Sequence, residues 1–225
     1  MKLPHPKLLV LSAPSGTGKT TIITELLALF QEGLKLSVSY TTRQPRPGEV
    51  EGVNYHFVDK KQFVRRIHEG DFLEWAEVHG NYYGTSKSQI QEYLSENRAI
   101  ILDVDVQGAL QLMEKSGLHA EFIFLSPPSL KELKKRLKGR GTENKEDLKI
   151  RLNNARMEME AQHQYQHQLV NKDLDQAILD FALLILQLCS TEKGKSDLDP
   201  KLIPDSNSSP KAQLEEISQK LKSIF

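Results

Sequence analysis

Residues 12–21 constrain the fold and the chemistry of this chain more than any other stretch, and they read Ser-Ala-Pro-Ser-Gly-Thr-Gly-Lys-Thr-Thr. They follow an apolar run at 8–11 that is typical of a buried β-strand, and they precede residues 22–30, whose apolar spacing is that of a helix. A strand, a glycine-bearing turn, Gly-Lys-Thr and a helix form the layout of a phosphate-binding P-loop. An ordinary turn between a strand and a helix is the alternative, and the flanking patterns favour the P-loop.

Each part of this motif has a physical reason. Small residues let backbone N–H groups turn inward around a polyphosphate, and the helix N-terminus adds the positive end of its dipole. Lys19 supplies a cation for the β- and γ-phosphates, and the Thr20 hydroxyl can ligate Mg²⁺. Position 13 holds Ala where the general motif has Gly, so the first turn has to accommodate a methyl group.

Composition limits the classes of protein to which the chain can belong. Of its 225 residues, 38% are hydrophobic and 27% are charged, which is the balance of a soluble globular protein with one substantial domain or two small ones. Lys plus Arg and Asp plus Glu number 30 each, so no global field favours nucleic acid or a membrane surface. The single cysteine, Cys189, excludes an internal disulfide framework and indicates a reducing compartment. Because residues 1–7 lack a secretory signal and no apolar run reaches membrane-spanning length, we expect a cytoplasmic enzyme, monomeric or homodimeric, without nucleic-acid or membrane partners.

Strand-like and helix-like patterns alternate along most of the chain. Buried-strand patterns cover 8–11, 99–106, 121–125 and 169–171, and helical patterns follow them over 20–31, 107–115, 129–138 and 175–188. Short apolar strands with intervening helices predict an α/β fold with a parallel sheet flanked by helices.

Two regions depart from this alternation. Residues of about 37–90 contain short polar strand patterns, over 37–42, 55–58, 72–78 and 82–85, with a helix at 60–69, and predict a small, mainly antiparallel β insertion. Residues of about 129–160 are dense in charge, and Arg140 stands between two glycines. That pattern suits a helical lid with glycine hinges, and a solvated helical pair is the alternative.

Two sets of side chains beyond the P-loop suggest chemistry. Asp103 and Asp105 follow an apolar strand, at the position where a P-loop enzyme places the acid that orients Mg²⁺ or substrate. Helix capping is the alternative role for this pair. Arg43 and Arg46 flank Gln-Pro in a turn and can converge on one phosphate group, whereas two exposed surface arginines are the alternative.

Several segments resemble motifs of guanylate kinases. Residues 37–49, Ser-Val-Ser-Tyr-Thr-Thr-Arg-Gln-Pro-Arg-Pro-Gly-Glu, together with Gly-Val-Asn-Tyr-His-Phe at 52–57, resemble the GMP-binding segment of that family. Further likenesses are Phe-Leu-Glu-Trp-Ala at 72–76, Gly-Asn-Tyr-Tyr-Gly-Thr at 80–85, Ile-Leu-Asp-Val-Asp-Val-Gln-Gly at 101–108 and Lys-Arg-Leu-Lys-Gly-Arg-Gly at 135–141. The resemblance spans about 8–188 and implies a domain over 1–190. That domain would have a P-loop NTPase core, a GMP-binding subdomain at about 37–90 and an arginine-bearing helical lid at about 129–160.

The resemblance also implies a role for each matching position. The residues that would hold ATP are Ala13, Pro14, Ser15, Gly16, Thr17, Gly18, Lys19, Thr20 and, at the adenine, Asn171. Those that would hold GMP are Ser39, Arg43, Arg46, Tyr55, Glu74, Tyr83, Thr85 and Asp103. Those that would act on the transferring phosphoryl group are Lys19, Arg136, Arg140 and Arg151. Glu74 would accept hydrogen bonds from guanine N1–H and the 2-amino group, Thr20 would ligate Mg²⁺, and Asp103 would order the metal through water.

The implied activity is Mg²⁺-dependent transfer of the ATP γ-phosphoryl group to GMP, and to dGMP, giving ADP and GDP in purine nucleotide metabolism and GMP recycling. One alternative is a kinase for another nucleoside monophosphate. Glu74 with Ser39 argues against it, because a carboxylate repels the N1 lone pair of adenine. The other alternative is a non-catalytic scaffold that binds phosphopeptides through the same arginines, and the intact Gly-Lys-Thr of the P-loop argues against that.

The tail after residue 190 lies outside the resemblance. Residues 190–210 are rich in Ser, Lys, Asp and Pro and predict a disordered linker. Residues 212–225 carry Leu214, Ile217, Leu221 and Phe225 at helical spacing, which predicts a short amphipathic helix. Such a helix either docks on its own core or binds a partner or a second copy.

Overall fold

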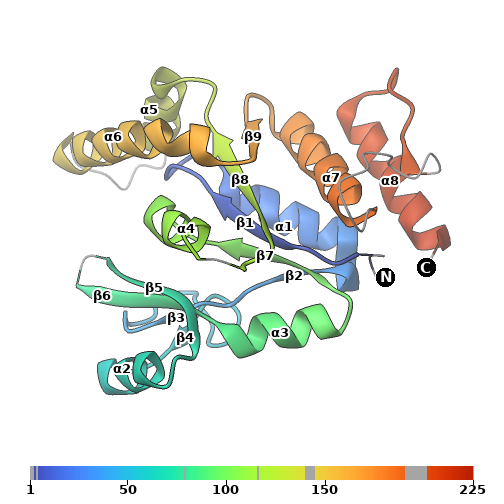
Figure 1. Cartoon of the computed structure of the whole chain (residues 1–225). Coiled ribbons are helices and arrows are strands. Elements are labelled where there is room, and N and C mark those ends of the chain that lie inside the picture. Colours follow the sequence, from blue (N-terminus) through green and yellow to red (C-terminus); the bar gives the residue numbers. More distant parts are fainter. Residues whose placement is uncertain are drawn as a thin grey trace.

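One five-stranded sheet forms the centre of the computed structural model, which describes residues 3, 5–78, 80–115, 117–139, 145–190 and 202–224 (Figure 1). The strand order is β2-β7-β1-β8-β9, and every neighbouring pair is parallel. Its strands are β1 (Leu8–Ser12), β2 (Leu34–Leu36), β7 (Ala99–Asp103), β8 (Ala120–Ser126) and β9 (His167–Val170). β1 lies in the middle because all five of its residues are buried, so both of its faces need a covering layer.

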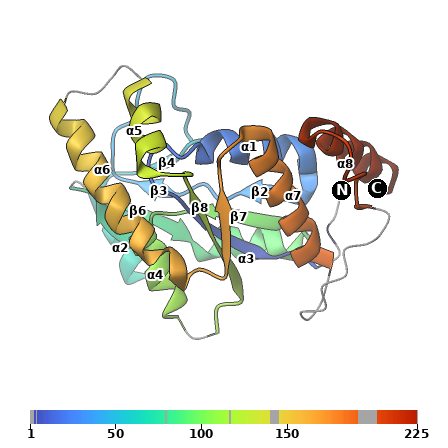
Figure 2. The same cartoon turned by 90° about the horizontal axis from the view of Figure 1, so that it is seen from above.

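Helices cover both faces of this sheet, as Figure 2 shows from above. Alternate residues of β1 point to opposite faces: Leu9 and Leu11 pack with helices α1 and α7, and Leu8 and Val10 pack with α3 and α4. The bounds of these helices are α1 (Lys19–Phe30), α3 (Lys87–Ser95), α4 (Val106–Met113) and α7 (Leu174–Ser190). The predicted α/β fold with a parallel sheet between helices is confirmed.

A second sheet lies beside the carboxyl end of the first and has the order β4-β3-β6-β5. Two of its three pairings are antiparallel and the β3–β4 pairing is parallel, so the predicted mainly antiparallel insertion is present. Helix α2 packs on this sheet by stacking Phe63 on Phe72, with ring centroids 4.4 Å apart. The elements are β3 (Tyr40–Thr41), β4 (His56–Phe57), α2 (Lys60–His68), β5 (Phe72–Val78) and β6 (Asn81–Ser86).

Some predicted boundaries are wrong for identifiable reasons. The strand predicted over 99–106 ends at Asp103, because Asp105 caps α4 by accepting the Gly108 N–H at 2.7 Å. β2 adds a three-residue edge strand to the main sheet, and α3 follows β6 directly; the sequence patterns indicated neither element. β2 is too short for a two-residue period to be visible.

Helices α5 (Leu130–Gly139) and α6 (Lys145–Glu160) form the region predicted as a lid, on the side of the P-loop opposite the small sheet (Figure 1). Their mutual contact is apolar and buries Leu133, Leu137 and Ala155. The Ser129 hydroxyl accepts the Glu132 N–H at 3.1 Å and so caps the start of α5. Arg140 and the glycine that follows it lie outside the described residues.

The last described helix, α8 (Pro210–Ile224), lies against α7 and α1. Ile217 and Leu221 are buried in the same apolar cluster as those helices, so the predicted amphipathic helix docks on its own core. Leu202, inside the range predicted as a linker, is buried there too, so this end of the range does not behave as a detached segment. Residues 191–201, the rest of the predicted linker, lie outside the described residues.

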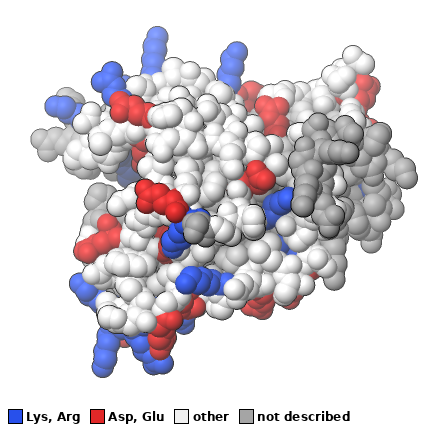
Figure 3. Space-filling model, in the orientation of Figure 1, with Lys and Arg blue, Asp and Glu red and all other residues white. Residues whose placement is uncertain are grey.

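On the face drawn in Figure 3, acidic and basic side chains are interspersed, as expected from equal numbers of each sign. None of the helices in the described ranges combines the length and apolar content needed to span a bilayer.

Candidate nucleotide site

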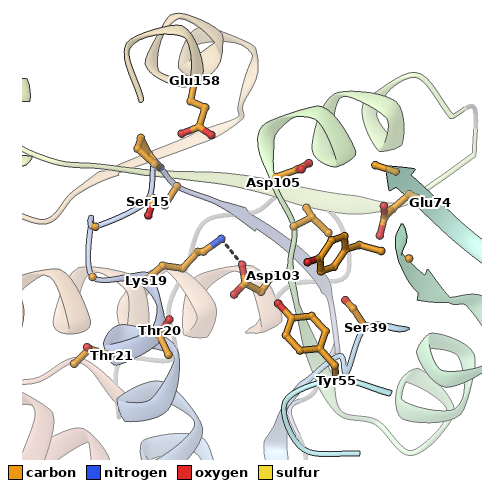
Figure 4. Close-up of a pocket in the computed structure, with 18 residues that line it drawn as sticks. Ser15, Lys19, Thr20, Thr21, Ser39, Tyr55, Glu74, Asp103, Asp105 and Glu158 are labelled. Atoms are coloured by element: carbon orange, nitrogen blue, oxygen red, sulfur yellow. Dashed lines mark ion pairs between the residues drawn. The ribbon is translucent and has the colours of Figure 1, made fainter. Parts of the chain in front are cut away.

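A cavity of about 450 Å³ opens at the carboxyl end of the main sheet, between the P-loop and the small sheet (Figure 4). Ligands of open parallel sheets bind at this edge, where the chain leaves neighbouring strands in opposite directions. The lining residues are Ala13, Pro14, Ser15, Gly16, Gly18, Lys19, Thr20, Thr21, Ser39, Tyr55, Glu74, Ala76, Tyr83, Gly84, Asp103, Val104, Asp105 and Glu158. P-loop residues therefore form one end of the cavity, and side chains of the small sheet form the other.

The two central glycines of the P-loop are required by conformation and by space. Gly16 has a φ of 89° and Gly18 a φ of 100°, which is the left-handed region that side chains disfavour. A Cβ atom on Gly16 would lie 2.7 Å from a methyl carbon of Leu137, and one on Gly18 would lie 2.6 Å from the side-chain nitrogen of Asn171. The P-loop is thus packed directly against α5 and against the residue that follows β9.

Side chains from distant segments fix the turn of the P-loop through the carbonyl of Thr17. Asn171 Nδ2 donates to this oxygen at 2.7 Å, and Arg136 Nη1 donates to it at 3.3 Å. Arg136 Nη2 also donates to the Asn171 carbonyl at 2.9 Å. The Thr17 hydroxyl donates to the Pro14 carbonyl at 2.7 Å, and Thr17 itself is fully buried. Thr17, Arg136 and Asn171 therefore shape the loop from behind and do not line the cavity.

At the centre of the cavity the Lys19 ammonium forms an ion pair with Asp103, drawn as a dashed line in Figure 4. Lys19 begins α1 and Asp103 ends β7, so the pair joins the P-loop to the neighbouring strand. Among the described residues that line the cavity, Lys19 is the one basic side chain, whereas Glu74, Asp103, Asp105 and Glu158 are acidic. A polyanionic ligand therefore requires further positive charge, from a metal ion or from arginines that lie outside the lining.

Oxygen donors in this part of the cavity fit a magnesium ion. The Thr20 hydroxyl and the Asp103 carboxylate both line it, and Mg²⁺ prefers hydroxyl, carboxylate and phosphate oxygens. Within the described residues no group of three or more His, Cys, Asp or Glu side chains is placed to cage a metal. Mg²⁺ usually keeps several waters and binds one or two protein ligands together with substrate phosphates, which is the number of ligands that Thr20 and Asp103 could supply.

At the opposite end of the cavity, Glu74 lies almost fully buried on β5, with 6% of its surface exposed. The Thr85 hydroxyl on the adjacent strand β6 donates to Glu74 Oε1 at 2.6 Å. Burial raises the pKa of Glu74, and the hydrogen bond from Thr85 opposes part of that rise. Ser39 and Tyr83 line the cavity nearby, so this end presents uncharged donors around one buried carboxyl group.

The arginine turn lies at the rim of the small sheet. Arg43 Nη2 donates to Glu49 Oε1 at 2.9 Å, and its Nη1 donates to the Gln44 carbonyl at 2.6 Å. The carboxylate of Glu49 holds the pKa of Arg43 above its ordinary value. Arg46 is exposed, and its backbone N–H donates to the other oxygen of Glu49 at 2.7 Å. Neither arginine lines the cavity, and Arg43 is held at the rim of the small sheet by Glu49 and by the Gln44 carbonyl.

Helix α6, in the region predicted as a lid, brings a cation and an anion to the P-loop. Arg151 Nη1 donates to the Ser15 hydroxyl at 3.2 Å. Glu158, two helical turns later on the same face, lines the cavity above the P-loop (Figure 4). Burial raises the pKa of Glu158, and the nearby charge of Lys19 opposes that rise. Both signs of charge therefore lie beside the P-loop.

Comparison with known proteins places these features in a family. The guanylate kinase family model matches residues 5–188. A protein named guanylate kinase from Desulfotalea psychrophila is 45% identical over 198 residues, which are 88% of this chain and 95% of that protein. Another of the same name, from Caldanaerobacter subterraneus, is 43% identical over 189 residues, or 84% of this chain and 91% of that protein. The crystal structure of guanylate kinase from Anaplasma phagocytophilum is similar with a TM-score of 0.68 and 32% identity, and covers 85% of this chain and 90% of that one.

The chain belongs to the guanylate kinase family. It is therefore an enzyme of the nucleotide kinase class, built on the α/β fold that the P-loop predicted. The family model ends at residue 188, so α8 lies beyond the matched range.

Within this guanylate kinase fold, many of the predicted site residues meet in the cavity. Predicted residues that line it are Ala13, Pro14, Ser15, Gly16, Gly18, Lys19, Thr20, Ser39, Tyr55, Glu74, Tyr83 and Asp103. Those that lie behind or beside it are Thr17, Arg43, Arg46, Thr85, Arg136, Arg151 and Asn171, and Arg140 is outside the described residues.

Sequence reasoning missed Glu158 and Gly84, and it did not carry Asp105 into the site. Gly84, like Tyr83, pairs with both β3 and β5, and because it has no side chain the cavity lining there is backbone. Glu158 had one available signal, its spacing of seven residues from Arg151, but several other charges on α6 have comparable spacings. Asp105 was singled out beside Asp103, and the structure gives it the capping role that was the alternative, with its side chain at the cavity edge.

Proposed function

We propose that this chain transfers the γ-phosphoryl group of ATP to GMP, with Mg²⁺, and releases ADP and GDP. One observation supports this most directly: a single cavity has the P-loop lysine at one end and the buried Glu74–Thr85 pair at the other. Two ligands can meet there, one bound by its phosphates and one read by its base. Membership of the guanylate kinase family supports the same pair of substrates.

In this proposal the P-loop and Lys19 hold the β- and γ-phosphates of ATP. Lys19 would exchange Asp103 for phosphate oxygens, which frees the Asp103 carboxylate. Thr20 and Asp103 would hold Mg²⁺, and the bound ion supplies neutralisation of phosphate charge as the bond to the leaving oxygen breaks. An oxygen of the GMP phosphate attacks the γ-phosphorus, the bond to the β–γ bridging oxygen breaks, and ADP leaves.

Positioning, rather than acid–base chemistry, is the main task of the protein in such a reaction. The GMP phosphate is already largely ionised at neutral pH, so no strong general base is required. Arg43 and Arg46 would hold that phosphate, and Tyr55 and Tyr83 would add hydroxyl donors. Arg151 from α6, with Arg136 and Arg140 of the same lid, would stabilise the charge that develops on the transferring group.

In this proposal Glu74 selects the base, together with Thr85 and Ser39. Guanine presents N1–H and the 2-amino group side by side, and a carboxylate can accept from both. Adenine presents a lone pair at N1 and would leave the buried carboxylate facing it unpaired. A site that loses its buried hydrogen bonds with the wrong substrate rejects that substrate by about 10⁴-fold.

A coupled assay of ADP release with GMP, dGMP, AMP and UMP as acceptors tests this proposal. We expect turnover with GMP and dGMP and very low turnover with AMP and UMP. Equal rates with AMP, or ADP release that does not depend on any acceptor, would contradict it. Chelation of divalent metal should abolish turnover, and added Mg²⁺ should restore it; activity that persists in a chelator would remove the metal from the mechanism.

A further inference from the structure

Helix α4 contacts strand β5 next to Glu74, and a glycine forms the contact. Gly108 is the third residue of α4 and is buried. Its backbone N–H donates to Asp105 Oδ1 at 2.7 Å, so the first turn of the helix is fixed by its cap. The Cα of Gly108 therefore has a fixed place, facing the carboxyl group of Glu74.

The space between Gly108 and Glu74 leaves no room for a side chain without movement. A Cβ atom on Gly108 would lie 3.3 Å from Glu74 Oε2 and 3.3 Å from Asp105 Oδ1, and 3.6 Å from the Cβ of Val104. The first two distances are tighter than ordinary contacts, so one neighbour would have to shift by a few tenths of an ångström. Each of the two carboxyl groups is held by a hydrogen bond, Asp105 by the Gly108 N–H at 2.7 Å and Glu74 by the Thr85 hydroxyl at 2.6 Å, so a Cβ atom at position 108 would press on Glu74 as well as on Asp105.

Glu74 has little freedom to move elsewhere. Its other oxygen, Oε1, accepts from the Thr85 hydroxyl at 2.6 Å, so the carboxyl group is wedged between β6 and α4. Just beyond the far end of α4, the Lys115 ammonium donates to the Leu73 carbonyl, one residue before Glu74 on β5. The strand that carries Glu74 is therefore held from both ends of α4, and a displaced carboxyl group would tilt away from its present plane.

We infer that Gly108 is a positioning residue for base selection, because its missing side chain lets Glu74 keep the orientation in which it accepts from guanine. The inference rests on the proposed function, in which Glu74 reads the base. Hydrogen bonds weaken steeply as their angle and length depart from the optimum, so a small tilt would weaken the contacts with N1–H and the 2-amino group. Gly108 itself touches no substrate in this account and acts through Glu74.

A purely structural role, in which Gly108 is needed only for close packing, predicts that alanine lowers the thermal midpoint without changing guanine selectivity. Glycine is a poorer helix former than alanine, so alanine at a helical position without functional demand should stabilise the protein. Gly108→Ala thus separates the two roles, because we expect it to preserve or raise the thermal midpoint while it harms guanine recognition.

The experiment measures kcat and KM of Gly108→Ala for GMP, for IMP, which lacks the 2-amino group, and for ATP. We expect KM for GMP to rise roughly tenfold, equivalent to about 1.4 kcal/mol, with KM for ATP within about twofold of the wild type. The ratio of kcat/KM for GMP to that for IMP should fall, because IMP never used the second donor. Gln107→Ala, an exposed neighbour on the same helix, is the matched control and should leave all these values unchanged.

A second variant tests whether Gly108 acts through Glu74. In a Glu74→Gln background, Gly108→Ala should no longer change the GMP-to-IMP ratio, because the group it displaces has already lost its function. The same fold-loss in both backgrounds, an unchanged ratio in Gly108→Ala, or equal losses for both substrates with a lower thermal midpoint would each overturn the inference. A wild-type enzyme without preference for GMP would overturn the proposed function and this inference together, whereas a normal wild-type preference with an unaffected Gly108→Ala variant overturns this inference alone.

Discussion

In the proposed function, the two ends of the cavity recognise their ligands by different physical means. At the phosphate end, consecutive residues between β1 and α1 wrap a turn whose two central glycines have positive φ. At the base end, the polar groups are side chains from separate segments: Ser39 just before β3, Glu74 on β5 and Thr85 on β6. Phosphate can be bound by backbone N–H groups and a helix terminus, which many sequences can supply, whereas a base edge requires particular side-chain atoms in particular places.

The two ends also differ in how deeply their charged groups are buried. The phosphate end has a partly exposed ion pair, with 20% of the Lys19 side chain and 34% of the Asp103 side chain accessible. The base end has a buried carboxyl group with a raised pKa. A substitution at the phosphate end should therefore change rate with little effect on folding, and one at the base end should change selectivity and stability together.

The largest effect is expected for Lys19→Ala at the phosphate end. Removing the one basic side chain in the described lining takes away charge that stabilises the transferring phosphoryl group. Groups of this kind are worth about 3–4 kcal/mol, so kcat should fall roughly a hundredfold to a thousandfold. Steady-state kinetics with a melting curve checks this, because the fold should survive. Near-normal turnover in a folded variant would disprove the role given to the P-loop lysine.

Glu74→Gln should produce the next largest effect, and at the other end. Glutamine keeps an oxygen for Thr85 but presents N–H donors where guanine also presents donors. We expect kcat/KM for GMP to fall by roughly tenfold to a hundredfold and the GMP-to-AMP ratio to narrow. KM for ATP should stay close to the wild-type value. If the ratio is unchanged in competition assays, Glu74 does not read the base.

A smaller effect should divide the arginines between the two substrates. Arg43→Ala should weaken GMP binding by about tenfold, because it removes a phosphate ligand from the rim of the small sheet. Arg151→Ala should lower kcat by about tenfold without changing GMP affinity, because a lid engages most strongly in the transition state. Arg136 is less suitable, since its hydrogen bonds to Thr17 and Asn171 also support the P-loop.

Isothermal titration of GMP into each arginine variant decides this division. Arg65→Ala, on the exposed side of α2 and paired with Glu69, serves as a control for loss of surface charge. Equal losses of GMP affinity in Arg43→Ala and Arg151→Ala would show that the lid arginine binds GMP already in the ground state.

The contrast between the ends also explains what the sequence could and could not predict. The P-loop was predictable because its strand, glycines, lysine and helix are contiguous, and the parallel sheet followed from the apolar strands around it.

The base end was predicted only through family resemblance, since nothing in the spacing of Glu74 and Thr85 indicates that their side chains meet. Two other contacts depend on tertiary packing, which no local pattern encodes: the hydrogen bond from Arg43 to Glu49, and the close approach of Gly108 to Glu74. The burial of Leu202 was missed for the same reason, whereas docking of the helix that carries Ile217 on its own core was one of the two alternatives left open by its spacing.

The smallest expected effect concerns the stability of the base end as a function of pH. Burial raises the pKa of Glu74 in the folded protein above its value in the unfolded chain. The folded state therefore holds this proton more tightly, so the carboxyl group does not lower the free energy of unfolding at acidic pH and lowers it increasingly as pH rises through its folded pKa.

Glu74→Gln removes this loss of stability, because the amide is neutral at every pH and still accepts from Thr85. We expect the variant to be more stable than the wild type at pH 7–8, with a thermal midpoint higher by about 2–4 °C for each kcal/mol recovered. The difference should shrink toward pH 4, where the wild-type side chain is protonated as well. Thermal melts of both proteins across this range provide the measurement. A difference that stays constant with pH, or a variant that is less stable at pH 8, would mean that the buried carboxyl group of Glu74 is already compensated by its surroundings.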